Sequence, residues 1–413
     1  MNSKKSKSLK KSELSKDIYI LYMEQLKTLP VVSIITTGRT GSDFLQSLLD
    51  NHEEILTFNG HLAVYSEYFN KSKVLNSKRP VVKDLVEEMV GFYLYKLVSK
   101  YEVQERKDKL GINYDESFIV DTHTFKLHMT GLLNHAELTT KNILLAFYGA
   151  YAINLNHNIL RKKVFVHHPH LGFEFDFFYQ DFTDCRIIFT SRDPRANFCS
   201  HVEHFRNYYK THDNQQHLFN ALEMVYEDTS IAKKYGLEFI STRLEDLPRK
   251  DIMISLAKWL SIDFDEGLLK STWAGLDWHG DRISGKEFPS SGWSSDRTSN
   301  NWEQRLGFFD KYIFNFILND RLLKYGYKVQ KTNIIDGILV FFLILLPSKY
   351  ERRFFSLNYF SYMFISGNRK NRLHYFKNAF YYFKRISLSY RYFFKRIQGV
   401  NADVRVIKAE LES

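Results

Sequence analysis

Two glycines, an arginine and several small hydroxyl residues occur together in "TTGRTGSDF", residues 36–44. The preceding "VVSII" is typical of a buried strand, and the following "DFLQSLLDNH" has the spacing of an amphipathic helix. Backbone N–H groups and the helix dipole at such a corner favour an anion, most often a phosphate. The residues predicted to form this anion site are Thr37, Gly38, Arg39, Thr40, Gly41, Ser42, Asp43 and Phe44.

The residue types at this corner suit different parts of that task. Gly38 and Gly41 permit close backbone approach, and Arg39 adds a full charge on a planar fork. The alternative is a tight corner in which the glycines serve only the backbone conformation. No lysine follows Gly41, so the pattern GxxxxGK[ST] is not met and kinase or ATPase chemistry is disfavoured.

A second candidate anion site lies in "CRIIFTSRDPRANFCS", residues 185–200. Arg192 stands at the end of a predicted strand, and Ser200 lies two turns into the helix that follows Pro194. The alternative is a surface arginine paired with Asp193. Ligands of open α/β sheets bind at the carboxyl ends of strands, so two such corners predict a ligand with phosphates at both ends.

Both stretches resemble motifs of the sulfotransferases that use 3′-phosphoadenosine 5′-phosphosulfate (PAPS). "TTGRTGSDFLQSLL" is similar to their 5′-phosphosulfate loop, in the RTGS form of carbohydrate sulfotransferases. "SRDPRANFCS" resembles the 3′-phosphate motif, with Arg192 and Ser200 at the matching positions. The resemblance covers about residues 30–330.

Two later stretches resemble the same family less specifically. "STRLEDL" is similar to a downstream YEDL segment, although Arg243 and Leu244 stand where a tyrosine is usual. "SSDRTSNNW" is similar to a late loop whose arginine reaches the 3′-phosphate, which would be Arg297.

The resemblance implies in-line transfer of a sulfonyl group from PAPS to an acceptor hydroxyl, on a carbohydrate or glycan, without a metal. Arg39 and neighbouring N–H groups would stabilise charge on the leaving phosphate. The glutamate base of related enzymes would fall near Gly60, which is a departure. The candidate bases are therefore His61, Glu67 and His168, each of which has an ordinary structural role as its alternative.

Two rival functions stay open at this point. One is a nucleotide or small-molecule kinase on a related fold. The other is an inactive, membrane-associated glycan-binding protein.

Alternating strands and helices predict an α/β fold, with a P-loop-like parallel sheet flanked by helices. Strands are predicted within residues 31–35, 161–168, 184–193 and 237–247, with a short extended element at 116–125. Helices are predicted at 17–28 and 141–156, and over 308–327 up to Gly326. The expected organisation is a basic tail and short helix (1–28), a sulfotransferase domain (29–330) and a basic, aromatic, mainly helical extension (331–413).

Charge is concentrated at the two ends of the 413-residue chain. Residues 1–16 hold six lysines and one glutamate, and residues 348–413 hold fourteen basic and four acidic residues. The total is +11, so the body is close to neutral, which argues against nucleic acid as a partner.

The extension interleaves basic and aromatic residues, and Phe376, Phe380 and Phe383 share one helical face. This pattern suits an anionic membrane surface, and packing against the catalytic body is the alternative. A membrane location would suit a lipid-linked glycan acceptor.

The two cysteines, Cys185 and Cys199, form no CxxC pair, and "HHPH" at 167–170 lacks the context of a zinc site. The polar N-terminal residues lack the apolar segment of a secretory leader. We therefore expect a cytoplasmic protein, with peripheral attachment at the inner face of a membrane as the open alternative.

Overall fold

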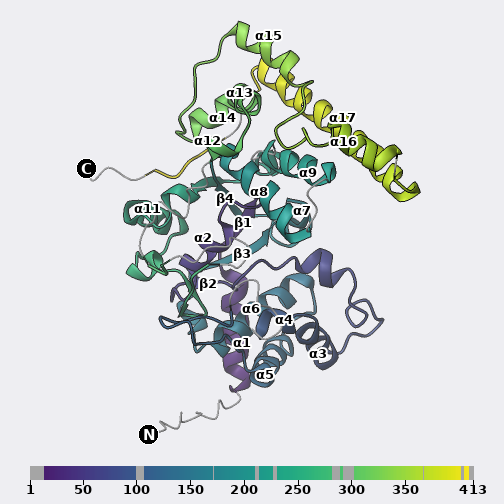
Figure 1. The fold of residues 1–413 in the computed structure, drawn as a ribbon. Coiled ribbons are helices and arrows are strands. Elements are labelled where there is room, and N and C mark those ends of the chain that lie inside the picture. Colours follow the sequence, from purple (N-terminus) through teal and green to yellow (C-terminus); the bar gives the residue numbers. More distant parts are fainter. Residues whose placement is uncertain are drawn as a thin grey trace, which may run out of the picture.

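The computed structural model describes residues 14–98, 107–170, 172–209, 214–226, 230–280, 289–291, 302–365, 367–400 and 404–408 (Figure 1). At its centre is a five-stranded parallel sheet with the order β2-β3-β1-β4-β5. The strands are β1 (Val31–Thr36), β2 (Ile55–Leu56), β3 (Val164–His170), β4 (Arg186–Ser191) and β5 (Phe239–Arg243). The predicted α/β fold class is confirmed.

Alternation along the strands separates two hydrophobic cores. On β1, Val32 and Ile34 face a core that includes residues of α2 and α11, whereas Ile35 belongs to a core shared with α6 and α7. Helices therefore cover both faces of the sheet, as an all-parallel sheet requires. These flanking helices are α2 (Ser42–Leu49), α6 (Thr140–Asn154), α7 (Gly172–Asp181) and α11 (Lys250–Leu260).

The segment before β3 is largely helical, and the predicted helices at 17–28 and 141–156 are present. The elements before and around α6 are α1 (Lys16–Thr28), η1 (Tyr65–Phe69), α3 (Val82–Phe92), α4 (Leu94–Leu97), α5 (Thr122–Leu133) and η3 (Ile159–Arg161).

The extended element predicted at 116–125 is only partly present. Glu116 and Ile119 form isolated antiparallel bridges, but α5 begins at Thr122. The carboxylate of Asp121 accepts the N–H groups of His123 and Thr124 and so caps this helix. Helix capping therefore overrides the β-branched character of the stretch.

After β4 the chain forms further helices and two short strands. The elements up to residue 277 are α8 (Pro194–Tyr209), α9 (Gln215–Tyr226), α10 (Ser230–Tyr235), η4 (Leu244–Asp246), η5 (Glu266–Leu269), β6 (Thr272–Trp273) and β7 (Leu276–Asp277). The later ones are α12 (Trp302–Arg305), α13 (Phe308–Ile317), α14 (Asn319–Lys324), α15 (Ile334–Leu343), α16 (Leu357–Phe360), η7 (Ser361–Ile365) and α17 (Arg369–Ile397).

The helix predicted over 308–327 is divided into α13 and α14. Leu318 leaves the helical conformation, with φ −98° and ψ 12°, and the buried Asn319 side chain donates to the carbonyl of Gln330. Helical periodicity does not reveal a bond to a residue eleven positions later. Gly326 follows the end of α14 with φ +76°, consistent with its predicted role as a terminator.

The C-terminal helices pack on the body of the protein. One hydrophobic cluster joins residues of α8 and α9 with residues of α13, α15 and α17, and Figure 1 shows α17 running beside α9. Within the described part of the chain, no helix has the length and apolarity of a transmembrane span.

Candidate active site

The loop between β1 and α2 has an unusual backbone. Gly38, Arg39 and Gly41 have φ values of +82°, +53° and +85°. A Cβ on Gly38 would lie 2.8 Å from Cε1 of His201, and one on Gly41 would lie 2.6 Å from Cδ1 of Leu244. The glycines therefore serve both the backbone conformation and close approach, although what approaches them is the protein's own side chains.

Hydrogen bonds between threonine hydroxyls link this loop to β4. Oγ1 of Thr36 accepts the N–H of Gly38 at 2.8 Å and lies 2.6 Å from Oγ1 of Thr40. The Thr40 hydroxyl is in turn 2.7 Å from Oγ1 of Thr190 on β4. Thr40 was predicted to form part of the anion site, and its hydroxyl is engaged within the protein.

The first turn of α2 contributes in more than one way. The Phe44 side chain is buried in the core between the sheet and α11, so only its backbone is available at the surface. The Asp43 carboxylate lies 3.7 Å from Nδ1 of His168. Ser42 begins the helix, and Thr37 is partly exposed.

The two predicted corners meet at one edge of the sheet. β1 and β4 are adjacent, with Thr36 opposite Thr190, so Arg192 emerges beside the glycine loop. Nε of Arg39 donates to Oγ of Ser200 at 3.4 Å, which joins the first corner to α8. Arg297, the third predicted phosphate contact, lies outside the described residues.

Arg192 is only 8 % exposed and interacts with charged side chains of both signs. Burial lowers the pKa of Arg192; the Glu245 carboxylate opposes this shift and the positive charge of Arg39 adds to it. The positive charges of the two guanidinium groups therefore repel each other. An anion between them would relieve that repulsion.

His201, which was not among the predicted site residues, supports the glycine loop. His201 is buried next to Gly38, and its Nε2 is 3.1 Å from the carbonyl oxygen of Thr37. Burial, reinforced by Arg39, lowers the pKa of His201 to about 3. The neutral ring therefore donates its Nε2–H to the carbonyl. Its only sequence signal is its position directly after Ser200.

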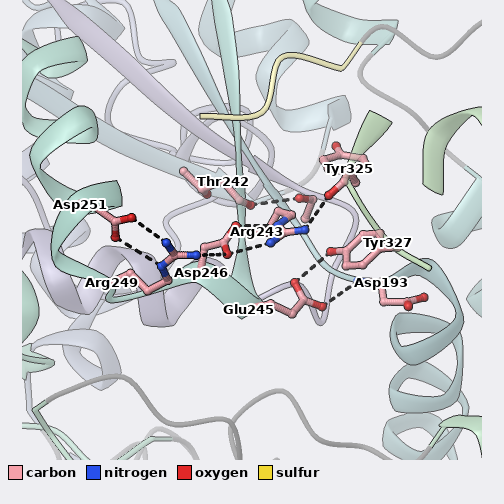
Figure 2. A network of polar contacts seen from close by, with 10 residues as sticks. Asp193, Thr242, Arg243, Glu245, Asp246, Arg249, Asp251, Tyr325 and Tyr327 are labelled. Atoms are coloured by element: carbon pink, nitrogen blue, oxygen red, sulfur yellow. Dashed lines mark hydrogen bonds and ion pairs between the residues drawn. The ribbon is translucent and has the colours of Figure 1, made fainter. Parts of the chain in front are cut away.

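The turn that carries Arg192 is held by a network of buried polar groups (Figure 2). Oε1 of Glu245 accepts the N–H of Asp193 at 3.0 Å, and Oε2 accepts the hydroxyl of Tyr327 at 2.9 Å. Burial raises the pKa of Glu245. The Asp193 carboxylate accepts two bonds from the Arg195 guanidinium, at 2.9 and 2.7 Å.

The "STRLEDL" stretch therefore contacts both corners. Leu244 packs against Gly41, and Glu245 holds the backbone of Asp193. Arg243 donates to the Asp246 carboxylate and to the carbonyl of Tyr325, which fixes the short helix η4 (Figure 2). The resemblance identified this stretch, but its supporting role depends on contacts between distant segments.

Three histidines gather on the other side of the glycine loop, at the end of β3. The N–H of Leu62 donates to the carbonyl of His168 at 2.9 Å and thereby brings His61 to this strand end. The ring of His61 lies 4.7 Å from that of His170 and 6.2 Å from that of His168, centroid to centroid. His170 was not among the predicted site residues.

The hydrogen bonds assign the tautomer of His168. The amide nitrogen of Gln46 donates to the carbonyl of Phe58, so its oxygen faces His168 and accepts from Nδ1 at 3.0 Å. Burial lowers the pKa of His168 well below its usual value. Nε2 of the neutral ring then accepts from Nδ1 of His170 at 3.3 Å.

The three candidate bases differ in access. His168 is fully buried and both its ring nitrogens are engaged. His61 is partly exposed at the edge of the cluster. Glu67 lies on η1, and the carboxylate of Glu174 accepts the first N–H groups of this element. Glu67 also interacts electrostatically with Glu174 and Tyr93.

The sheet order arranges these groups in a row. The histidines lie at the end of β3, the glycine loop follows β1, Arg192 follows β4 and Glu245 follows β5. The two arginines lie in the middle of the row, and the β3 side holds the neutral imidazole of His168. Such a row suits an anionic donor beside an acceptor that must lose a proton.

Comparison with known proteins agrees with this arrangement. No group of three or more histidine, cysteine or acidic side chains in the described ranges is placed to hold a metal ion. No curated protein matches the chain. The family model described as "Sulfotransferase domain" matches residues 29–260, more than half of the chain and all five strands of the central sheet. The chain therefore belongs to the sulfotransferase family and is a PAPS-dependent sulfotransferase.

Proposed function

We propose that the protein transfers the sulfonyl group of PAPS to a hydroxyl of a carbohydrate or glycan by in-line displacement. Family membership supplies the general reaction and the donor. The acceptor class rests on the RTGS form of the glycine loop, which resembles carbohydrate sulfotransferases. Family membership also favours sulfonyl transfer over the rival kinase function.

The observation that carries the donor site is the meeting of Arg39, Arg192 and Ser200 at adjacent strand ends. Two mutually repelling guanidinium groups, one of them almost fully buried, fit a ligand that carries phosphate. We assign the 5′-phosphosulfate to Arg39 with the N–H groups of residues 40–42, and the 3′-phosphate to Arg192 and Ser200. Asp43 would contribute only its backbone, because its carboxylate would repel the ligand.

Transfer places negative charge on the oxygen that links the sulfonyl group to the departing phosphate. In this assignment Arg39 and the N–H groups at the start of α2 face that oxygen before reaction, so they would stabilise the developing charge without reorganising. A charge-assisted hydrogen bond contributes about 1.5–3 kcal/mol. Loss of Arg39 should therefore cost at least about a factor of ten in rate.

His61 is our choice for the general base. Like His170, it is a partly exposed member of the histidine cluster, whereas His168 is enclosed. In this arrangement His61 takes the proton of the acceptor hydroxyl, and His168 and His170 position it by packing. The acceptor would then approach from the β3 side of the glycine loop.

The test measures donor binding and transfer separately. Calorimetry with 3′-phosphoadenosine 5′-phosphate should show binding, and radiolabelled PAPS should label a glycan from a panel. Arg39→Met should lower transfer at least tenfold. His61→Asn should lower kcat by about 10²–10⁴ while leaving nucleotide affinity unchanged.

Arg161→Met is the matched control, because Arg161 is an exposed arginine at the other end of β3. Nucleotide binding without transfer to any glycan would favour the inactive binding protein. Thermal protection by ATP but not by PAPS would favour the kinase.

A further inference from the structure

Helix α17 exposes an apolar stripe. Its large exposed apolar residues are three or four positions apart, except for one interval of eleven between Phe383 and Phe394, and this spacing places them on one side of the helix. They are Leu373, Phe376, Phe380, Phe383, Phe394 and Ile397. The first four are each 58–65 % exposed, which is unusual for such side chains on a water-facing helix.

Cations run along the same side of α17. Lys377, Lys384 and Arg391 are spaced by seven residues, each is exposed, and each lies next to the stripe. The 29 residues of α17 include nine lysines and arginines and no acidic residue. The exposed side is therefore both apolar and positively charged.

The inward side of α17 is fixed by buried polar contacts, so its orientation is defined. Arg385 donates to the carbonyls of Ile344 and Leu346 at 2.8 and 3.1 Å and to the carboxylate of Glu351 at 3.3 Å. Tyr382 donates to the carbonyl of Leu345 at 2.6 Å. A rotation of α17 that hid the stripe would break these bonds.

Helix α15 extends the apolar surface. Its exposed residues include Ile334, Ile335, Ile338 and Phe342, and Ile334 is 84 % exposed. α15 meets the end of α17, where Tyr390 donates to the carbonyl of Phe341 at 2.7 Å (Figure 1). A Cβ on Gly337 would lie 3.9 Å from Cδ1 of Ile397, so the two helices are in close contact there.

We propose that these sides of α15 and α17 form a membrane face, which binds the surface of an anionic lipid bilayer. The face comprises the ten apolar residues named above with Lys377, Lys384 and Arg391. Phenylalanine, leucine and isoleucine side chains enter the boundary between headgroups and acyl chains. The lysines and arginine extend to lipid phosphates.

Charge decides between the bilayer and a second copy of the chain. Two copies that met through this face would bring their cations together with no carboxylate from α17 to compensate. An anionic bilayer satisfies the apolar and the cationic residues at once. The face therefore fits a lipid surface better than a copy of itself.

The test is co-sedimentation of the full-length protein with two kinds of vesicle. One kind is phosphatidylcholine alone and the other contains phosphatidylglycerol as well. The protein should bind the anionic vesicles at least tenfold more tightly. Phe376→Ser with Phe383→Ser should weaken that binding at least tenfold, because two inserted rings are lost.

A second variant separates charge from apolar insertion. This variant combines Lys377→Gln, Lys384→Gln and Arg391→Gln. At low salt its affinity for anionic vesicles should be about a hundredfold lower than that of the wild type, which removes most of the preference for anionic vesicles. The control is Ile112→Ser with Ile119→Ser, two isoleucines of comparable exposure (75 % and 67 %) outside α15 and α17. Thermal unfolding and nucleotide binding should be unchanged in all three variants.

Equal vesicle binding by the wild type and the phenylalanine variant would overturn the proposal. The proposal would also be overturned if the wild type did not bind vesicles but formed a dimer that the phenylalanine variant did not form. The face would then be an interface between two copies of the chain. Neither outcome bears on sulfonyl transfer, because the membrane face shares no residue with the site.

Discussion

The candidate active site and the membrane face both concentrate positive charge, but in opposite ways. At the site, Arg192 and Arg195 are buried, and Arg195 is bonded to Asp193, Asn315 and the carbonyl of Lys328. On the membrane face, the cations are exposed beside apolar side chains. Buried cations with fixed partners can select a small anion by geometry, whereas exposed cations suit a surface with no fixed geometry.

The largest expected effect on nucleotide binding comes from Arg192→Met. The change removes a buried charge from the 3′-phosphate side of the proposed donor site, so nucleotide affinity should fall by about a hundredfold, as for one or two charge-assisted bonds. Calorimetry with 3′-phosphoadenosine 5′-phosphate measures this. Vesicle binding should not change, which would sharpen the contrast between the two regions. Wild-type nucleotide affinity in this variant would show that the corner is a structural turn.

The largest expected effect on stability arises within α17 itself. Arg385 is buried against Glu351, whereas its neighbour Lys384 is exposed. Arg385→Met should destabilise the protein by about 3–5 kcal/mol because it leaves a buried carboxylate without its cation. Lys384→Met should change stability by no more than about 0.5 kcal/mol. Urea unfolding of both variants checks this, and similar losses would mean that burial does not distinguish the two positions.

The smallest effect is a pH dependence of the sheet region. His167 is fully buried, and burial alone lowers its pKa to about 3. The pKa of histidine in the unfolded chain is about 6.5. Below that pH the ring of residue 167 is protonated in the unfolded chain but stays neutral in the folded protein. Stability from this group is therefore complete above about pH 7 and falls as the pH falls toward 3, by about 2 kcal/mol at pH 5.

His167→Phe isolates that contribution. The ring of His167 stacks on Phe178 and accepts or donates one bond with the Tyr148 hydroxyl at 2.8 Å. The variant should lose about 2 kcal/mol less than the wild type between pH 7.5 and pH 5. Chemical denaturation at the two pH values measures the difference, and parallel losses would contradict the assignment.

Local patterns predicted much of the sheet. The strand-to-helix corner at residues 36–44 could be identified because glycines, hydroxyls and an arginine cannot serve a buried strand or a helix interior. The strands around Val164, Arg186 and Phe239 were found from continuous apolar runs. The sequence did not predict the break at Leu318, and it predicted an extended element where Asp121 caps a helix. Both features depend on a specific hydrogen bond rather than on periodicity.

Supporting residues of the site were harder to find. His201 and Glu245 act through partners far away in the sequence. His170 bonds to His168, two residues away, and only folding brings it next to His61. Glu245, for example, holds the backbone of Asp193, 52 residues earlier. The sequence predicted His61 and His168 as alternatives, and folding places them in one cluster.

The sequence by itself determined the chemistry available to this protein: a glycine loop with Arg39, a second corner with Arg192 and Ser200, and a basic, aromatic C-terminal helix. Those properties are local, because residue type and spacing set backbone freedom, charge and periodicity. Only the tertiary structure decided that β1 and β4 are neighbours, that the histidines of β3 and residue 61 meet, and that α17 turns its apolar stripe outward. Strand order and helix orientation arise from packing and hydrogen bonds between distant segments, which no local pattern encodes.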